Sequence, residues 1–350
     1  MSRRVVTLAV AGFMVVMLSA VAALLPVPYV ALSPGPTTDT LGAVEQTDLI
    51  RIDGHRTYPA KGHLDLTTVS VLGGPRQRMD LVTALRGWID DEIAVLPERQ
   101  IYREGETAEQ VERESAEQMH ESQENATTSA LRYLGFPVTT RVLVKELAPG
   151  SPSKGRLEPG DVLLDVDGRP AEGGDRLREL ITAHEPGDTV HLVVRRDGER
   201  IETSVTTVQA DDGRTIIGVA TRDDADYPFK VQISLKDVGG PSAGLMFSLG
   251  IVDKLTPGSL TGGRHVAGTG IIDDRGHVGP IGGIQQKLVG ARAAGATVFL
   301  APAGNCSEVV GAVPDDLRVL KVATLDQAVD ALDTLREGGP AASRLPTCTG

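Results

Sequence analysis

A single serine stands at the junction between a glycine-rich turn and a long apolar stretch, in the run VGGPSAGLMFSLGI at residues 238–251. No charged residue lies between Asp237 and Asp253. Ser242 can be a helix N-cap that accepts a hydrogen bond from an otherwise unpaired backbone N–H. It can also be a nucleophile at a helix N-terminus, where backbone N–H groups are able to stabilise an oxyanion. This stretch alone leaves both interpretations open.

A nucleophilic serine needs a base, because its free hydroxyl is nearly inert at neutral pH. The run PIGGIQQKLVGARAAG at residues 280–295 predicts a helix that begins at its glycine pair. Lys287 falls on the apolar stripe of this helix, together with Ile284, Leu288 and Ala291. Burial and the positive end of the helix dipole would both lower the pKa of this lysine and make it a general base. The alternative is a lysine whose stem packs while its ammonium group reaches water.

Histidine, metal and cofactor chemistry have weaker support. Neither His265 nor His277 lies in a recognisable triad motif, and GPSAG lacks the G-x-S-x-G spacing of a nucleophile elbow. A histidine-based hydrolase stays an alternative, because both histidines are near Lys287 in the sequence. Two cysteines are too few for a metal site, and the seven histidines include no H-E-x-x-H spacing. We therefore expect no metal and no cofactor.

The two motifs together carry a family resemblance. GPSAG followed by PIGGIQQK, with the lysine 45 positions after the serine, closely resembles the proteolytic domain of the Lon protease family. The resemblance implies peptide-bond hydrolysis by a Ser-Lys dyad, with Ser242 as nucleophile and Lys287 as base. It extends to Thr269, for which we expect a supporting hydrogen bond to the lysine. Because the turn around Ser242 opens a helix, the N–H groups of Gly240 and Ser242 are the candidate oxyanion donors.

A polar segment from about Thr107 to Leu134 is predicted to be a long helix, since Met119, Ala126 and other apolar residues recur at helical spacing. Its run MHESQENATTSAL is similar to a Lon-family helix with an M-x-E-S-x-x-A pattern. One departure is Gly239, which stands where many Lon enzymes have an aspartate.

A second resemblance covers residues 136–208. The run APGSPSKGRLEPGDVLLDVDGRP resembles a PDZ domain of the bacterial type, a fold that binds extended peptides by strand addition, often at their C-terminus. The loop Leu134, Gly135 and Phe136 is the candidate cradle for a peptide carboxylate. The alternative is that this loop only ends the preceding helix. If the Lon resemblance holds on both sides, the PDZ domain is inserted into the protease domain.

The N-terminus predicts a membrane anchor. Arg3 and Arg4 precede the uncharged stretch 5–25, which as a helix would be about 31 Å long and would span a bilayer core. The arginines should stay in the cytoplasm, so the rest of the chain would lie outside. A cleaved signal peptide is the alternative, because residues 20–22 read Ala-Val-Ala.

Composition limits the kinds of partner that the chain is expected to bind. The net charge of −12 and the 3% of aromatic residues argue against nucleic acid as a partner. In an oxidising compartment the two cysteines, Cys306 and Cys348, are expected to form a disulfide.

These features predict an α+β fold in which a Lon-type proteolytic domain holds an inserted PDZ domain and follows one transmembrane helix. The predicted parts are a cytoplasmic start at 1–4, the transmembrane helix at 5–25, a linker at 26–44, protease segments at 45–135 and 209–338, the PDZ domain at 136–208 and a tail at 339–350. This arrangement is similar to the membrane-anchored, PDZ-containing Lon-like proteases of Gram-positive bacteria.

The expected function is that of an ATP-independent, extracytoplasmic serine endopeptidase at the cell membrane. No G-x-x-x-x-G-K-[ST] motif occurs in the chain, so its expected substrates are unfolded or flexible proteins, recruited by the PDZ domain and in some cases by their C-termini. The family resemblance also implies a homo-oligomer. The alternative is a non-catalytic PDZ scaffold or holdase with an inert Lon-like domain.

Overall fold

The chain folds into two compact units. The computed structural model describes all residues except 1–2, 24, 45–46, 211, 236–237 and 349–350. The first unit combines residues 1–135 with residues 229–350, and the second unit, residues 136–228, is inserted between these two segments.

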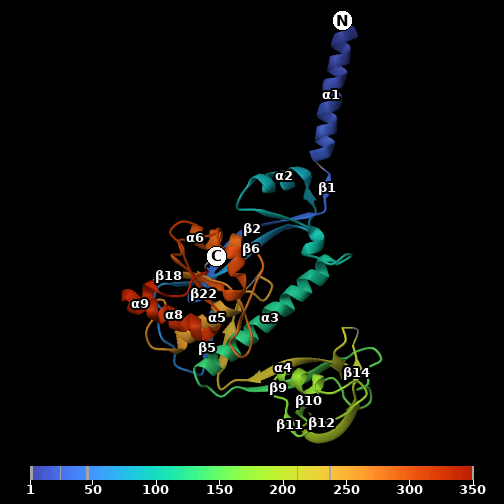
Figure 1. The fold of residues 1–350 in the computed structure, drawn as a ribbon, viewed down its shortest axis with the longest axis vertical. Coiled ribbons are helices and arrows are strands. Elements are labelled where there is room, and N and C mark those ends of the chain that lie inside the picture. The colour runs from blue at the N-terminus through green and yellow to red at the C-terminus, as the bar shows by residue number, and fades with distance from the viewer. Residues whose placement is uncertain (1–2, 24, 45–46, 211, 236–237, 349–350) are drawn as a thin grey trace. The chain divides into compact units, whose positions relative to one another are not determined.

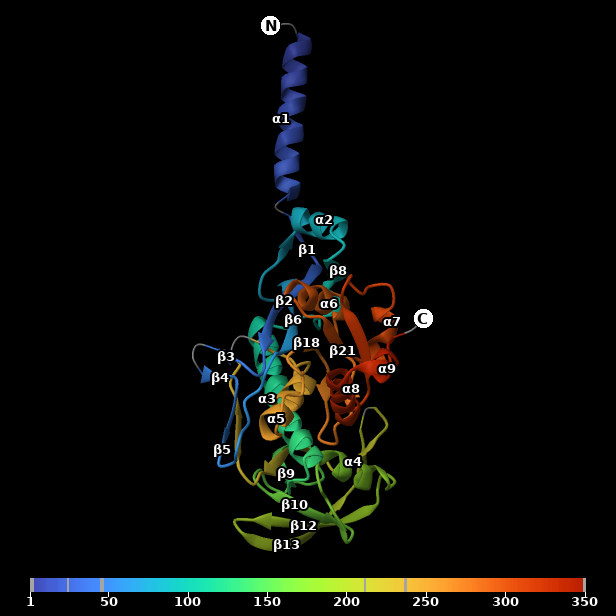
Figure 2. The ribbon, with the colours of Figure 1, turned by 90° about the vertical axis from the view of Figure 1, so that its left-hand side faces the viewer.

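A six-stranded mixed sheet forms the framework of the first unit (Figures 1 and 2). β6 and β18 lie side by side at its centre and run parallel, whereas β2 is antiparallel to β6. The strand order is β22 (Arg318–Val322), β21 (Val298–Pro302), β18 (His265–Gly268), β6 (His63–Gly73), β2 (Tyr29–Asp39) and β8 (Ala94–Pro97).

Helices cover both faces of this sheet. Ala267 of β18 packs in an apolar cluster with residues of α6 (Ile284–Ala293). A side chain at the next position, Gly268, would collide with Met246 of α5 (Gly244–Leu255). Successive residues of a strand point to opposite faces, so α6 and α5 lie on opposite sides of β18.

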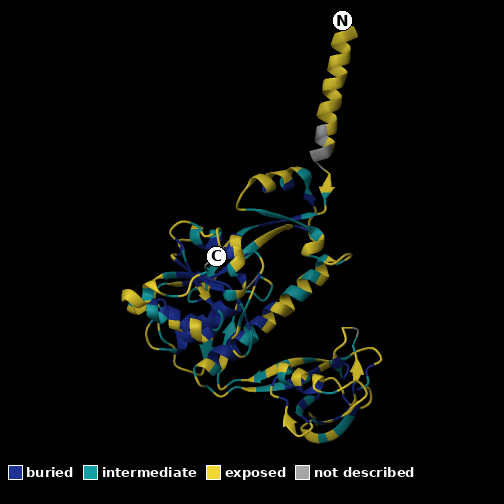
Figure 3. Ribbon diagram, in the orientation of Figure 1, coloured by how far each residue is buried: buried dark blue, intermediate teal, exposed yellow. Residues whose placement is uncertain are grey.

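α5 is buried along its whole length, as its apolar sequence predicts. It packs against α3 (Ala108–Tyr133) and α8 (Leu325–Glu337). A hydrogen bond of 3.0 Å between the hydroxyls of Ser129 and Ser248 joins α3 to α5 inside this contact. Figure 3 shows buried residues concentrated at α5 and the neighbouring sheet.

The long helix predicted for residues 107–134 is confirmed as α3. Thr107 is its N-cap and forms a capping box with Gln110, each side chain accepting from the other residue's backbone N–H. The helix ends at the C-cap Leu134, and Gly135 follows with φ +76°, a conformation that glycine adopts without a steric penalty.

The remaining elements complete the first unit. They are α1 (Arg3–Ala23), β1 (Pro26–Val27), β3 (Ala43–Val44), β4 (Thr47–Asp48), β5 (Ile50–Asp53), β7 (Met79–Asp80), α2 (Leu81–Ile89), β17 (Lys230–Ile233), β19 (Ile271–Ile272), β20 (Val278–Gly279), α7 (Cys306–Val309), α9 (Gly339–Ser343) and the 3-10 turns Glu98–Gln100 and Ala303–Asn305.

The stretch 5–25, predicted to cross a membrane, falls mainly within α1. Over the part of the chain that the structure describes, no helix meets the length and apolarity that a membrane span requires. The predicted transmembrane helix is therefore not supported.

The second unit is a curved antiparallel sheet with one main helix, α4 (Gly174–Thr182). Apolar residues from the strands and from α4 fill a single core cluster. The strand order is β13 (Glu199–Thr206), β12 (Thr189–Arg196), β10 (Val162–Val166), β9 (Thr139–Leu147) and β16 (Val219–Asp226), with β11 (Arg169–Pro170) beside β10 and a separate pair β14 (Val208–Gln209) and β15 (Thr215–Ile216).

The second unit ends later than the predicted boundary at residue 208. β16 pairs with β9 from Val219↔Leu147 to Asp226↔Thr139, which brings the chain up to Pro228 into this unit. The sequence gives no strong sign of this pairing, because β16 is a polar strand whose partner lies far earlier in the chain.

A disulfide joins Cys306 to Cys348 and fastens the C-terminal tail to the first unit. The tail is held further by a hydrogen bond of 3.0 Å from the Lys321 N–H to the Pro346 carbonyl oxygen. In the chain-entropy account of cross-links, closing a loop of 42 residues stabilises the fold by about 4 kcal/mol.

Candidate active site

Ser242 lies in the tight turn that leads into α5, and its side chain does not cap the helix. The N-cap of α5 is Ala243, and among the described residues no side-chain hydrogen bond caps this helix. Gly240 turns the chain with φ +85°, which a residue with a side chain rarely adopts. The N-cap interpretation of Ser242 is therefore wrong, and its hydroxyl is left for another partner.

The backbone on the C-terminal side of β18 fixes the position of Ser242. The Thr269 hydroxyl and the Gly270 N–H both donate to the Ser242 carbonyl oxygen, at 3.0 and 2.9 Å. The Leu245 N–H in turn donates to the Gly270 carbonyl oxygen at 3.0 Å. The turn and the strand end thus hold each other in a fixed register.

α3 holds the same turn from its other side. The Ser122 hydroxyl donates to the Pro241 carbonyl oxygen at 3.0 Å, and the Gly240 N–H donates to the Ser115 carbonyl oxygen at 3.0 Å. A Cβ atom at Gly239 would lie 2.7 Å from Cβ of Ser115. This close approach explains in physical terms why the chain has glycine, rather than aspartate, at this position.

Lys287 reaches this turn from α6, on the opposite face of the sheet. The helix begins after Gly283, and Lys287 is only 3% exposed. Its Nζ donates to Oγ of Ser242 at 2.7 Å and to Oγ1 of Thr269 at 2.9 Å. The structure thus brings together the three side chains singled out in the sequence, and it excludes a lysine whose ammonium group reaches water.

The surroundings of Lys287 disfavour its charged form. Burial lowers its pKa from the ordinary value of 10.5 to about 7. Its two hydrogen-bond acceptors are neutral hydroxyls, and over the described residues no carboxylate forms an ion pair with it. A neutral amine is therefore populated near pH 7, and its lone pair can accept the Ser242 proton.

One of the two predicted oxyanion donors is corrected. The Gly240 N–H already donates to Ser115, so it is not available to a substrate. The Ser242 N–H has no acceptor within the described parts of the chain and lies at the turn that opens α5. Ser242 N–H is the candidate that remains.

A cavity of about 340 Å³ opens beside Ser242. Its walls are mostly apolar, and besides Ser242 the polar lining residues are Asn305 and Glu308. Asn305 is buried and exchanges two hydrogen bonds with the backbone of Ile281, at 2.9 and 2.8 Å. This wall is not predictable from the sequence motifs. The one feature of the sequence close to it is Cys306, whose disulfide fastens the start of α7 next to Asn305.

The two histidines considered as alternative bases lie elsewhere. His265 opens β18 and its Nε2 bonds to Oδ2 of Asp65 at 2.8 Å, whereas His277 is exposed and bonds to Asp273. Neither has a hydrogen bond to Ser242 in the region that the structure describes. The geometry therefore favours Lys287 as the partner of the serine.

The predicted peptide cradle at Leu134, Gly135 and Phe136 does not lie at an open edge of the PDZ-like sheet. Leu134 caps α3, and the strand that follows, β9, is paired on both sides, with β10 and with β16. A strand with two neighbours cannot accept a peptide as a third, so a peptide held at this loop would not add to β9, and the cradle itself stays a prediction. The edge strands of this sheet are β13 and β16.

Two protein families match the chain. The PDZ domain family matches residues 110–207, and the Lon protease (S16) C-terminal proteolytic domain matches residues 199–335. The chain carries a PDZ domain and a Lon-type proteolytic domain. The Lon-type match includes Ser242, Thr269 and Lys287.

Curated relatives agree with these matches. The chain is 31% identical over 164 residues to a Lon protease of Heliobacterium modesticaldum, covering 45% of this chain and 20% of the relative. It is 39% identical over 79 residues to Lon protease 1 of Bacillus subtilis, covering 23% and 10%. A probable periplasmic serine endoprotease, DegP-like, of Pseudomonas fulva is 36% identical over 74 residues, covering 21% and 15%. The chain thus spans a fifth or less of the length of these relatives.

Among solved structures, the PDZ domain of an SdrC-like protein from Listeria monocytogenes matches 23% of this chain and 85% of its own length, with 20% identity and a TM-score of 0.22.

The buried lysine leads to a prediction about stability. Replacing Lys287 with methionine should stabilise the fold at neutral pH, because the unfolded chain binds a proton on this lysine more readily than the folded chain does. The destabilisation of the wild-type chain by its buried lysine decreases as the pH rises from the folded-state pKa of about 7 toward the unfolded-state pKa. The advantage of Lys287→Met should therefore shrink by roughly 1.4 kcal/mol per pH unit across this window. Urea denaturation of both proteins at several pH values measures this difference, and parallel stability curves would show that the lysine is not buried in its neutral form.

Proposed function

We propose that this chain is a serine endopeptidase in which Ser242 is the nucleophile and Lys287 is the general base. The observation that carries this proposal is the 2.7 Å hydrogen bond between Nζ of Lys287 and Oγ of Ser242, made by a buried lysine with a pKa of about 7. The Lon-type match over the same residues supports it.

The proposed reaction follows from these contacts. Neutral Lys287 accepts the hydroxyl proton as Oγ of Ser242 bonds to the carbonyl carbon of the scissile peptide. The Ser242 N–H stabilises the oxyanion of the tetrahedral intermediate. Protonated Lys287 then gives its proton to the leaving amine as the C–N bond breaks, which leaves an acyl-enzyme. Water hydrolyses this ester, with Lys287 again as the base.

Thr269 is a positioning residue in this scheme. Its hydroxyl donates to the Ser242 carbonyl oxygen and accepts from Nζ of Lys287, so it sets both the turn and the lysine. The cavity beside Ser242 would take one side chain of the substrate next to the scissile bond. Its largely apolar walls favour an apolar side chain there.

Substrate recruitment is assigned to the PDZ domain. β16 is an edge strand, and α4 packs beside it, with the Gly174 N–H donating to Oδ1 of Asp223 at 2.7 Å. An extended segment of a substrate protein would add to the open edge of β16 and run alongside α4. This assignment is an alternative to the cradle predicted at the end of α3.

We place the catalytic part in an extracytoplasmic, oxidising compartment, and the Cys306–Cys348 disulfide supports this. We also propose that its 350 residues cleave without ATP, because they contain no P-loop motif. Unfolded or flexible proteins are then the fitting substrates.

Variants of the two central residues test the proposal. Ser242→Ala, Lys287→Ala and Lys287→Arg should each lower the hydrolysis of unfolded casein, assayed without nucleotide, by about a thousandfold or more. Arginine should fail because it stays charged and cannot accept the proton. Labelling by a fluorophosphonate probe should be lost in Ser242→Ala.

The chain offers matched controls for these variants. Ser248 is a buried serine of α5 that bonds only to structural groups, and Lys254 is 9% exposed with its Nζ donating to the Ile50 carbonyl oxygen at 2.7 Å. Ser248→Ala and Lys254→Met should keep the activity, with some loss of stability. Substantial hydrolysis by Lys287→Arg would contradict the role of the lysine. A wild-type chain that neither hydrolyses casein nor reacts with the probe would favour the scaffold alternative.

Removing the PDZ domain tests its role in recruitment. A variant in which a short Gly/Ser bridge replaces residues 136–228 should have a higher KM for casein, because the added strand on β16 is lost. Its kcat for a short unstructured peptide should persist, because the three active-site side chains all lie in the first unit. A variant that is folded by circular dichroism and yet has lost peptide turnover would count against this division of labour.

A further inference from the structure

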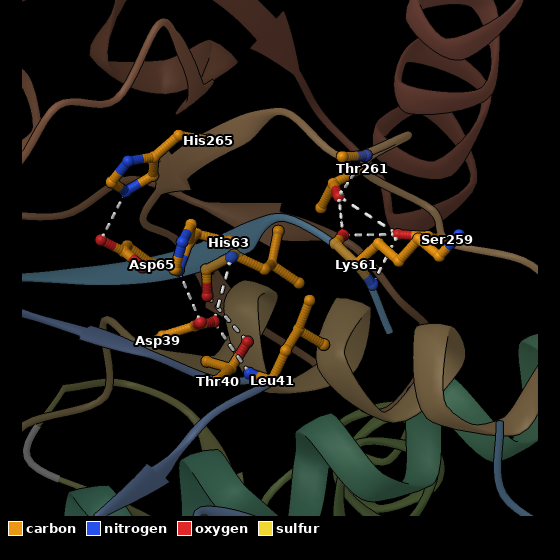
Figure 4. Close-up of polar contacts among 11 residues, drawn as sticks. Asp39, Thr40, Leu41, Lys61, His63, Asp65, Ser259, Thr261 and His265 are labelled. Atoms are coloured by element: carbon orange, nitrogen blue, oxygen red, sulfur yellow. Dashed lines mark hydrogen bonds and ion pairs between the residues drawn. The ribbon is translucent and has the colours of Figure 1, made fainter. Parts of the chain in front are cut away.

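A second cluster of polar side chains, made of carboxylates and imidazoles, lies at the other end of β18 from Thr269. Asp39 ends β2, His63 and Asp65 lie near the start of β6, and His265 starts β18 (Figure 4). The register pairs Asp39 with Asp65 and His63 with His265 across neighbouring strands. Paired residues, and residues two apart on one strand, share a face. All four side chains therefore lie on one face of the sheet.

These four side chains form two contacting pairs. Nδ1 of His63 lies 2.9 Å from Oδ2 of Asp39, and Nε2 of His265 lies 2.8 Å from Oδ2 of Asp65. The two imidazole rings have their centroids 4.9 Å apart. One ligand atom from each of Asp39, His63 and Asp65 lies within 4.8 Å of the other two.

The negative charges of the two carboxylates favour a cation beside them. Asp39 and Asp65 are direct partners on adjacent strands, an arrangement in which like charges repel. Asp65 is also 5% exposed, so water screens it poorly. Within the described ranges no lysine or arginine forms an ion pair with either carboxylate, and each is paired only with a histidine. A dication between the carboxylates would balance both charges.

The site is held rigid before any ion arrives. Oδ1 of Asp39 accepts the N–H groups of Leu41 and Leu64, at 3.0 and 3.1 Å, which leaves Oδ2 facing His63. The Thr40 hydroxyl donates to the Leu64 carbonyl oxygen at 2.8 Å. The end of β2 is thereby fixed onto β6.

The start of β6 is fastened as well. The Lys61 carbonyl oxygen accepts the hydroxyls of Ser259 and Thr261, at 2.6 and 2.5 Å (Figure 4). The His63 N–H donates to the Arg264 carbonyl oxygen at 3.0 Å, next to His265. The three strands that carry the cluster are thus held together by hydrogen bonds to backbone groups, which favours a preorganised site.

We propose that Asp39, His63 and Asp65 bind a divalent transition-metal ion of the zinc class. Neutral Nδ1 of His63 and one oxygen from each carboxylate are the ligands. Imidazole and carboxylate groups suit such ions, and tetrahedral zinc with bonds of about 2.0–2.1 Å sets neighbouring ligand atoms about 3.3 Å apart, close to the Asp39–His63 separation. The exposed side of His63 leaves room for water as a further ligand.

His265 is a positioning residue for this metal site. Its hydrogen bond to Asp65 orients the carboxylate. Such a bond, from a residue that does not itself bind the ion, changes the metal affinity of a site. The ion would clamp β2 to β6 at the end of β18 remote from Thr269. This role is distinct from peptide hydrolysis and does not depend on it.

Zinc titration of the full chain, without an affinity tag and after chelator treatment and dialysis, tests this site. Calorimetry with Zn²⁺ should give one ion per chain, confirmed by elemental analysis after gel filtration. His63→Ala and Asp65→Asn should each weaken zinc binding by about tenfold or more. Losing a residue that only hydrogen-bonds to a metal ligand already has an effect of that size. Zn²⁺ should also raise the Tm of the wild-type chain and not that of these variants.

A matched control comes from the second unit. His184 also contacts two aspartates, with Nε2 2.9 Å from Asp167 and Nδ1 3.9 Å from Asp188, but it is not part of the proposed site. His184→Ala should leave zinc binding unchanged. Asp39→Asn provides a second variant should Asp65→Asn fail to fold. The proposal is overturned if the wild-type chain binds no Zn²⁺, or if folded His63→Ala and Asp39→Asn bind it as tightly as the wild type.

Discussion

The burial of one amino group against two hydroxyls is the constraint on which the rest of the protease domain depends. Nζ of Lys287 meets Ser242 and Thr269 in a place that is nearly closed to water. Burial disfavours the charged lysine there, so a large share of the amine is neutral near pH 7. A hydroxyl held against a neutral amine can lose its proton as it attacks, and this is the chemistry we propose.

Meeting this constraint requires elements from distant parts of the chain. α6 carries the lysine on one face of the sheet, α5 begins just after the serine on the other, and Thr269 follows the strand between them. α3, which precedes the inserted PDZ domain, holds the serine turn through Ser115 and Ser122. The insertion therefore separates, in sequence, two segments that must meet in space. The disulfide at Cys306 steadies the cavity wall next to the same turn.

What the sequence could predict follows from how local each signal is. α3 was predictable from its apolar spacing, and Lys287 stood out because it lies on the apolar stripe of a single helix. The use of the Gly240 N–H by Ser115 was not predictable, because it depends on how α3 packs against a turn far away in the chain. The pairing of β16 with β9 extends the second unit beyond the predicted boundary at residue 208 and leaves β16 at the edge of its sheet. The Asp39–His63–Asp65 cluster likewise arises from strand register, which residue types alone do not specify.

The charge state of Lys287 is the most direct test of the account. Protein labelled with ¹³C at lysine Cε can be titrated by NMR, with the Lys287 resonance assigned by its loss in Lys287→Met. We predict that this resonance titrates near pH 7, so that a large share of the amine is neutral in the resting protein. Titration near the ordinary lysine value of about 10.4 would contradict the account, because the serine would then face an ammonium group that cannot accept its proton.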